Sequence, residues 1–191
     1  MKLIILDRDG TINEDRDDYV KSPAEWLPIP GALEAIARLN QAGWRVVVAT
    51  NQSGLGRGLF DAAALNAMHA KMHKLLAAVG GKVDAVFFCP HRPEEKCNCR
   101  KPAPGLFVQI LDRFGVNAQE VEVHAVGDTA RDLQAAAAAH CHPHLVLTGK
   151  ALALRDQLQD GQQLPHERDG LPASTRIHTD LAAFARHLLT P

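Results

Sequence analysis

The chain has 191 residues, of which 46% are hydrophobic and 23% charged, and its formal net charge is −1. This length and apolar content suit one well-packed core, so we expect a single domain over residues 1–191. A net charge near zero gives no general attraction to nucleic acid or to a membrane surface, and we expect neither as a partner. The first apolar run, Leu3–Leu6, is too short for a secretory signal or a membrane span, which favours a cytoplasmic protein.

Strand and helix patterns alternate along the chain. In order, the predicted elements are a strand at Leu3–Leu6, a helix at Ala32–Ala42, a strand at Trp44–Ala49, a helix at Asp61–Val79, a strand at Val83–Phe88, a helix at Gly105–Phe114, a strand at Val121–Val126, a helix at Ala130–His140, strands at His144–Leu147 and Arg176–His178, and a helix at Asp180–Leu189. The polar stretch Gln157–Ser174 is typical of a loop. The alternation predicts a three-layer, Rossmann-like α/β fold, with helices on both faces of a parallel sheet.

Two carboxylates follow the first predicted strand, because Asp7 and Asp9 come directly after Leu6. In a parallel sheet they lie at the carboxyl end of the strand, where such folds bind ligands. Carboxylates this close repel each other unless a cation lies between them, and Mg²⁺ prefers oxygen ligands. One Asp is then free to act as a nucleophile and the other to transfer protons. The alternative is a surface turn, in which Asp and Gly are ordinary residues.

Other strand ends add polar groups at the same edge. The second strand is followed by Thr50-Asn51-Gln52-Ser53-Gly54, whose hydroxyl, amide and backbone N–H groups suit a phosphate oxygen. A loop that only starts the next helix is the alternative. The fourth strand precedes Asp128, and a loop after the third contains Arg100 and Lys101. The convergence of these groups predicts an active site.

A cysteine-rich loop lies at about residues 89–102. Cys89, His91, Cys97 and Cys99 supply three thiolates and one imidazole, a full tetrahedral set for structural Zn²⁺ that leaves no position for a substrate. Such an ion would hold the loop and the basic pair after it. Cys141 lies elsewhere and is expected to be a small buried residue.

Taken in order, Asp7-Arg-Asp-Gly-Thr11, the strand end at Thr50, Lys101 and the segment Gly127–Asp132 resemble the four motifs of the haloacid-dehalogenase-like phosphohydrolase superfamily. Within it, Asp7–Asn13, Thr50–Gly58 and Cys89–Pro102 resemble the bacterial heptose-bisphosphate phosphatase family. The resemblance covers most of residues 1–150, while residues 151–191 carry no diagnostic motif.

The resemblance implies a mechanism. Asp7 attacks phosphorus to form an aspartyl-phosphate, and Asp9 protonates the leaving oxygen and later deprotonates the attacking water. Thr50 and Lys101 hold the phosphoryl group. Mg²⁺ is held by Asp7, the backbone carbonyl of Asp9, and Asp128, with Asp132 supporting the site.

The resemblance also implies a small phosphorylated sugar as the substrate. Removal of the 7-phosphate of D-glycero-D-manno-heptose 1,7-bisphosphate, a step toward the nucleotide-activated heptose of lipopolysaccharide, is the expected reaction. The gaps before and after Thr50 are too short for a cap domain, so specificity is expected from loops. The expected substrate-binding residues are Asp15, Tyr19, Thr50, Asn51, Gln52, Ser53, Arg57, Arg100 and Lys101.

Two other functions stay open on the sequence. Histidinol-phosphate phosphatases share the aspartates and the zinc loop but usually lack the pattern Ser53–Gly58. A non-enzymatic zinc-binding interaction module is disfavoured by the complete set of catalytic residue types. Thr129 stands where many heptose-family members carry Lys, which weakens a second-phosphate contact there and leaves the preferred anomer open. We expect a monomer.

Overall fold

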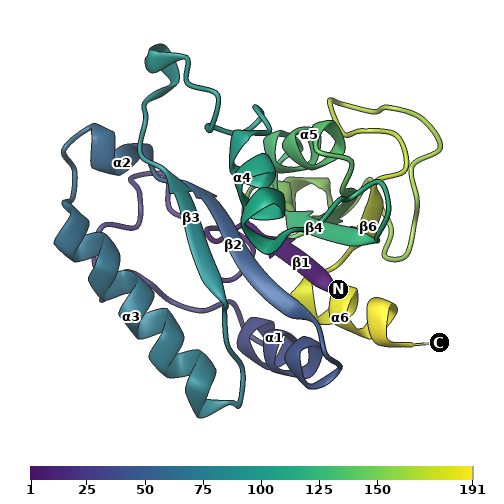
Figure 1. Ribbon diagram of the computed structural model, residues 1–191, viewed down its shortest axis with the longest axis horizontal. Helices are drawn as coiled ribbons and strands as arrows, with labels where there is room; N and C mark the ends of the chain where they lie inside the picture. The colour runs from purple at the N-terminus through teal and green to yellow at the C-terminus, as the bar shows by residue number, and fades with distance from the viewer. Residues whose placement is uncertain (191) are drawn as a thin grey trace.

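The computed structural model describes residues 1–190. Its sheet has six parallel strands in the order β3-β2-β1-β4-β5-β6 (Figure 1). The strands are β1 (Leu3–Leu6), β2 (Arg45–Asn51), β3 (Ala85–Cys89), β4 (Val123–Gly127), β5 (His142–Val146) and β6 (Arg176–His178). The strand order reverses at β1, which pairs with β2 on one side and β4 on the other. A ligand site is therefore expected at the carboxyl end of β1.

Helices cover both faces of the sheet (Figure 1). One face carries α1 (Ala32–Gln41), α3 (Ala62–Ala78) and α6 (Leu181–Leu189), and the other carries α4 (Gly105–Phe114) and α5 (Ala130–Ala138). Side chains of β1 alternate between the two, since Ile4 packs with the first group and Leu3 with the second. Asp61 caps α3 by accepting a hydrogen bond from the Ala64 N–H at 2.8 Å. The predicted three-layer fold is confirmed.

A few elements differ from the sequence prediction. A four-residue helix, α2 (Ser53–Gly56), follows β2, and 3₁₀ turns form at Pro93–Glu95 and Gly149–Leu154. These elements are too short to produce a periodic apolar pattern. Strand β5 begins at His142 and therefore includes Pro143, which cannot donate a backbone hydrogen bond. The strand tolerates this proline because β6 pairs with β5 only from His144 onward, so Pro143 lies at a local edge of the sheet.

The segment Gln157–Ser174 forms no helix or strand, as predicted, but it is not purely a surface loop. Leu158, Leu164 and Leu171 are buried against side chains of α5, β5 and β6. Within residues 1–190, the connections after β1 and β2 contain only turns, α1, α2 and α3, so neither forms a separate cap over the sheet edge. Across the same residues, no helix has the length and apolar character needed to cross a membrane.

Candidate active site

A pocket of about 270 Å³ lies at the carboxyl ends of β1, β2 and β4. Most of the predicted site residues come together in its wall. The lining side chains from the strand ends are Asp7, Asp9, Thr50, Asn51, Gln52, Ser53, Asp128, Thr129, Arg131 and Asp132, and those from other loops are Asp15, Arg16, Asp17, Tyr19, Val20, Arg100, Lys101 and Lys150. The parallel topology thus assembles groups that are more than a hundred residues apart in the chain.

Lys101 is the cation at the floor of the pocket. Its ammonium lies 2.8 Å from Asp7 Oδ1 and 2.6 Å from Asp132 Oδ1, and it donates to the Ala49 carbonyl at 2.7 Å. Burial alone would lower the pKa of Lys101, but the two carboxylates outweigh it and raise the pKa. Asn51 holds the Lys101 backbone through two hydrogen bonds of 3.1 Å, one to its N–H and one to its carbonyl. The loop after β3 is therefore fastened to the end of β2.

Three carboxylates meet beside Lys101. One oxygen each from Asp7, Asp128 and Asp132 lies within 4.8 Å of the others. The pKa of Asp7 is raised to about 7, mainly by burial and secondly by repulsion from Asp132. The pKa of Asp128 is raised to about 8, mainly by burial and secondly by repulsion from Asp7. Asp128 Oδ1 is buried and has no hydrogen-bond partner among residues 1–190. A hard divalent cation fits this cluster, because it would neutralise the repulsion and supply the missing partner.

Asp132 has a fixed place in the cluster. It is the third residue of α5, and its Oδ2 accepts hydrogen bonds from the Thr129 N–H at 3.0 Å and the Thr129 hydroxyl at 2.6 Å. Its other oxygen faces Lys101. Asp132 therefore binds the N-cap residue Thr129 through one oxygen and orients Lys101 through the other.

Asp9 is not one of the three clustered carboxylates, although it lines the same pocket. Its oxygens accept hydrogen bonds from Arg8, Asn13 and Gln52. The Gln52 Nε2 group also donates to Thr50 Oγ1 at 2.9 Å, which ties the ends of β1 and β2 together. These donors engage both oxygens of the Asp9 side chain, and the metal contact of its backbone carbonyl stays a prediction from the resemblance.

The four predicted zinc ligands form one cluster. The three sulfur–sulfur separations among Cys89, Cys97 and Cys99 are 3.2, 3.5 and 3.6 Å, and His91 Nδ1 lies 3.3 Å from Cys99 Sγ and 3.5 Å from Cys89 Sγ. A tetrahedral ion with bonds of about 2.3 Å spaces its ligand sulfurs by about 3.8 Å, close to these values. All four cysteines of the chain are free of disulfides.

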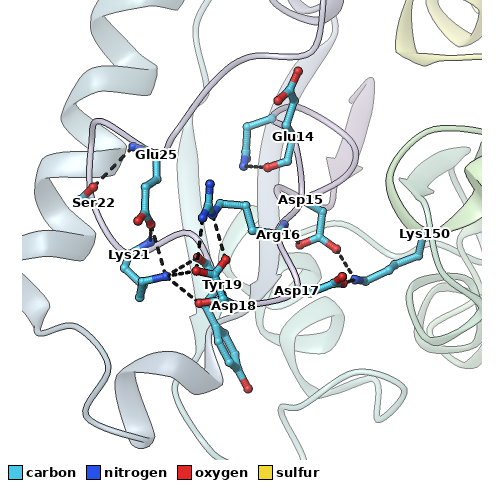
Figure 2. A network of polar contacts seen from close by, with 11 residues as sticks. Glu14, Asp15, Arg16, Asp17, Asp18, Tyr19, Lys21, Ser22, Glu25 and Lys150 are labelled. Atoms are coloured by element: carbon cyan, nitrogen blue, oxygen red, sulfur yellow. Dashed lines mark hydrogen bonds and ion pairs between the residues drawn. The ribbon is translucent and has the colours of Figure 1, made fainter.

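An acidic loop, residues 14–19, contributes Asp15, Arg16, Asp17 and Tyr19 to the pocket lining. Figure 2 shows the polar contacts of this loop. Lys150 lies 3.1 Å from Asp15 Oδ2 and 2.7 Å from Asp17 Oδ1, so it ties this loop to the 3₁₀ turn that follows β5. Farther along, Asp18 forms ion pairs with Arg16 and Lys21: its Oδ1 lies 3.0 Å from Arg16 Nε, and its Oδ2 lies 2.8 Å from Lys21 Nζ. Asp15 and Asp17 are therefore paired with Lys150 from outside the loop, and Asp18 is paired with basic residues close to it in the chain.

Some placements differ from the expectation. Arg57 lies outside the pocket lining, and its guanidinium is 3.7 Å from Glu94, because α2 carries the chain away from the strand end. Arg131 and Lys150 line the pocket but were not predicted. Lys150 could have been found from its place after the fifth strand, by the same rule that located Asp128. Arg131 carries no signal of its own, because only the orientation of α5 turns it toward the pocket.

Comparison with known proteins agrees with this geometry. The model of the haloacid dehalogenase-like hydrolase family matches residues 12–140. The chain belongs to this family of hydrolases, and the predicted resemblance is confirmed. The match begins after Asp7 and Asp9, so the roles of those two residues stay predictions.

More specific likeness comes from individual relatives. The chain is 57% identical to a D-glycero-beta-D-manno-heptose-1,7-bisphosphate 7-phosphatase of Bordetella bronchiseptica over 99% of this chain and 98% of the relative. It is 49% identical to the protein of that name from Neisseria meningitidis, over 99% and 95%. A crystal structure of the B. bronchiseptica phosphatase with magnesium and phosphate superposes with a TM-score of 0.89, at 56% identity, covering 99% of this chain and 98% of that one.

Proposed function

We propose that this protein removes the 7-phosphate of D-glycero-β-D-manno-heptose 1,7-bisphosphate. The observation that carries the proposal is the Lys101 ammonium held between Asp7 and Asp132 beside a buried cluster of carboxylates. This arrangement suits attack by Asp7 on a phosphoryl group whose charge Lys101 offsets. The substrate assignment rests on the full-length relatives at 49–57% identity.

In the proposed reaction, an Asp7 oxygen attacks phosphorus while the bond to the sugar oxygen breaks. Asp9 gives its proton to that leaving oxygen. A water molecule then attacks the aspartyl-phosphate, Asp9 takes a proton from it, and inorganic phosphate leaves. Thr50 and Lys101 hold the phosphoryl oxygens during both steps. Asn51 keeps Lys101 in place through the two bonds to its backbone.

Mg²⁺ is the proposed cofactor of the carboxylate cluster. Asp7, Asp128 and the backbone carbonyl of Asp9 would hold it, while Asp132 is occupied by Lys101 and Thr129. The bound ion supplies positive charge that lowers the repulsion between the attacking carboxylate and the phosphoryl oxygens. The structure of the magnesium-bound B. bronchiseptica relative supports this assignment.

Zn²⁺ is the proposed structural ion of the cluster Cys89, His91, Cys97 and Cys99. Its role would be to stiffen the loop that carries Arg100 and Lys101 into the pocket. Arg100 Nη1 lies 3.4 Å from the His91 carbonyl, a backbone group of this loop.

The proposal is tested by phosphate release with Mg²⁺ from both anomers of heptose 1,7-bisphosphate and from histidinol phosphate. We expect the β anomer to be used with a kcat/KM at least about a hundredfold above that of histidinol phosphate. Preference for histidinol phosphate would assign the chain to the histidinol-phosphate phosphatases. If no phosphomonoester were hydrolysed, the heptose-phosphatase proposal would fail and the non-enzymatic zinc-binding module would be the remaining function.

Affinity for Mg²⁺ is expected to rise with pH. In the metal-free protein the pKa of Asp7 is raised to about 7 and that of Asp128 to about 8, so protons compete with the ion below these values. Each displaced proton changes the affinity by up to about tenfold per pH unit, and we expect at least a tenfold gain between pH 6 and 8. Calorimetric titration in buffers of different ionisation heat measures both the affinity and the protons released. An affinity independent of pH would contradict the assignment.

Arg131 is expected to bind the second phosphate of the substrate. It is exposed at the start of α5 and, within residues 1–190, has no hydrogen bond or ion pair, whereas Lys150 is paired with Asp15 and Asp17. Arg131 and Arg100 both line a neighbouring hollow to which no Asp or Glu among residues 1–190 contributes. Arg131→Ala should raise KM for the bisphosphate about 5- to 20-fold, the loss of one charge-assisted hydrogen bond at an exposed site.

The control for Arg131→Ala is Arg113→Ala, an exposed arginine on α4 that lies outside the pocket lining. Steady-state kinetics on heptose 7-phosphate, which lacks the second phosphate, should show no change in either variant. An equal rise in KM for the mono- and bisphosphate would place Arg131 elsewhere in recognition.

A further inference from the structure

Three side chains donate hydrogen bonds to the Asp9 carboxylate. Arg8 Nη2 lies 2.9 Å from Oδ1 and 3.0 Å from Oδ2, and Arg8 Nε lies 3.2 Å from Oδ1. Asn13 Nδ2 donates to Oδ1 at 2.9 Å, and Gln52 Nε2 donates to Oδ2 at 2.8 Å. Each oxygen therefore accepts bonds from two side chains, an arrangement that a rotated carboxylate would lose.

The donors are themselves immobilised. The Arg8 side chain is fully buried, and its Nη1 lies 3.2 Å from His69 Nε2 on α3. Asn13 and Gln52 are also buried, and Gln52 is bound to Thr50 Oγ1 at 2.9 Å. Burying a guanidinium is costly unless its partner is held in good geometry. The position of Asp9 is thus set by the packing of the segment after β1, the end of β2 and helix α3, and not by the rotamer of Asp9 alone.

We propose that Gln52, together with Arg8 and Asn13, is a positioning residue that holds the Asp9 carboxyl group for proton exchange with the leaving oxygen. Gln52 links Asp9 to Thr50, so the acid–base group and the phosphoryl-binding hydroxyl move as one unit. This inference rests on the proposed function and assigns Gln52 a role other than the substrate contact predicted from the sequence. The proton still passes from Asp9 to the leaving oxygen as its bond to phosphorus breaks, and returns from the attacking water.

The test is Gln52→Met, which keeps the length of the side chain and removes its N–H donors. Substrates with different leaving groups separate the positioning role from a structural one. The sugar alkoxide needs a proton to leave, whereas p-nitrophenolate is stable as an anion. We expect kcat/KM to fall about 30-fold or more for the bisphosphate and less than about threefold for p-nitrophenyl phosphate. A burst of p-nitrophenol should appear, because the water attack that follows also uses Asp9.

Gln134→Met is the matched control, since Gln134 Nε2 donates to the Gly170 carbonyl at 2.7 Å, outside the pocket lining. Asn13→Ala removes the other neutral donor and should reproduce the selective loss if Gln52→Met does not fold. Equal losses on both substrates in an active enzyme, or a raised KM with unchanged kcat, would overturn the positioning role. A wild-type protein inactive on the bisphosphate would instead overturn the proposed function.

Discussion

Asp7→Asn is expected to lower kcat by at least about ten-thousandfold on every phosphomonoester, because an amide cannot attack phosphorus. The change preserves the shape of the side chain and removes one of the three clustered carboxylates. The pKa of Asp7 is raised to about 7, mainly by burial and then by Asp132, so its ionised form is unfavourable in the metal-free fold. We therefore expect the melting temperature without Mg²⁺ to be unchanged or higher, while activity is lost.

The measurement combines phosphate release with thermal unfolding. Asp112→Asn, at an exposed aspartate on α4, is the matched control and should keep full activity. Acid quenching of the wild-type enzyme during turnover with labelled substrate should trap phosphate on Asp7. If Asp7→Asn retained even a few per cent of the rate, the nucleophile would have to be another group in the pocket.

Cys99→Ala is expected to abolish zinc binding and to lower the free energy of unfolding by about 3 kcal/mol or more. The cysteine loop contributes few apolar side chains to the core, so metal bonds would supply much of its stability. Because the same loop carries Arg100 and Lys101, we also expect kcat/KM to fall by about tenfold or more. Zinc per chain is measured by elemental analysis, and stability by urea unfolding.

Cys141→Ala is the control, since Cys141 is also buried but lies apart from the cluster. Cys141→Ala should retain one equivalent of zinc. Its free energy of unfolding should fall by only about 1 kcal/mol, because the substitution leaves a small cavity. Less than half an equivalent of zinc in the wild-type protein, together with equal stability of the two variants, would show that the loop is not a zinc site.

Much of the fold could be predicted from local patterns. The strand Leu3–Leu6 and the helix Gly105–Phe114 have the predicted bounds, because a continuous apolar run and an amphipathic run ending at Gly115 are distinctive. The short helix α2 was missed, since four residues carry no periodicity. The buried leucines within Gln157–Ser174 were missed because their contacts are with elements far away in the chain.

The candidate site divides in the same way. Asp7, Thr50 and Asp128 follow predicted strands, and the carboxyl ends of parallel strands share one edge, so the sequence by itself determined that they meet. The spacing of the cysteine loop likewise determined its cluster.

The tertiary structure alone decided the partners of each group. The packing of separate elements decides that Gln52 is bound to Asp9 and that Asn51 holds the Lys101 backbone. It also decides that Arg57 is paired with Glu94, while Arg131 has no partner among residues 1–190. Side-chain hydrogen bonds are set by distances of a few tenths of an ångström between segments far apart in the chain, and residue order carries no measure of those distances.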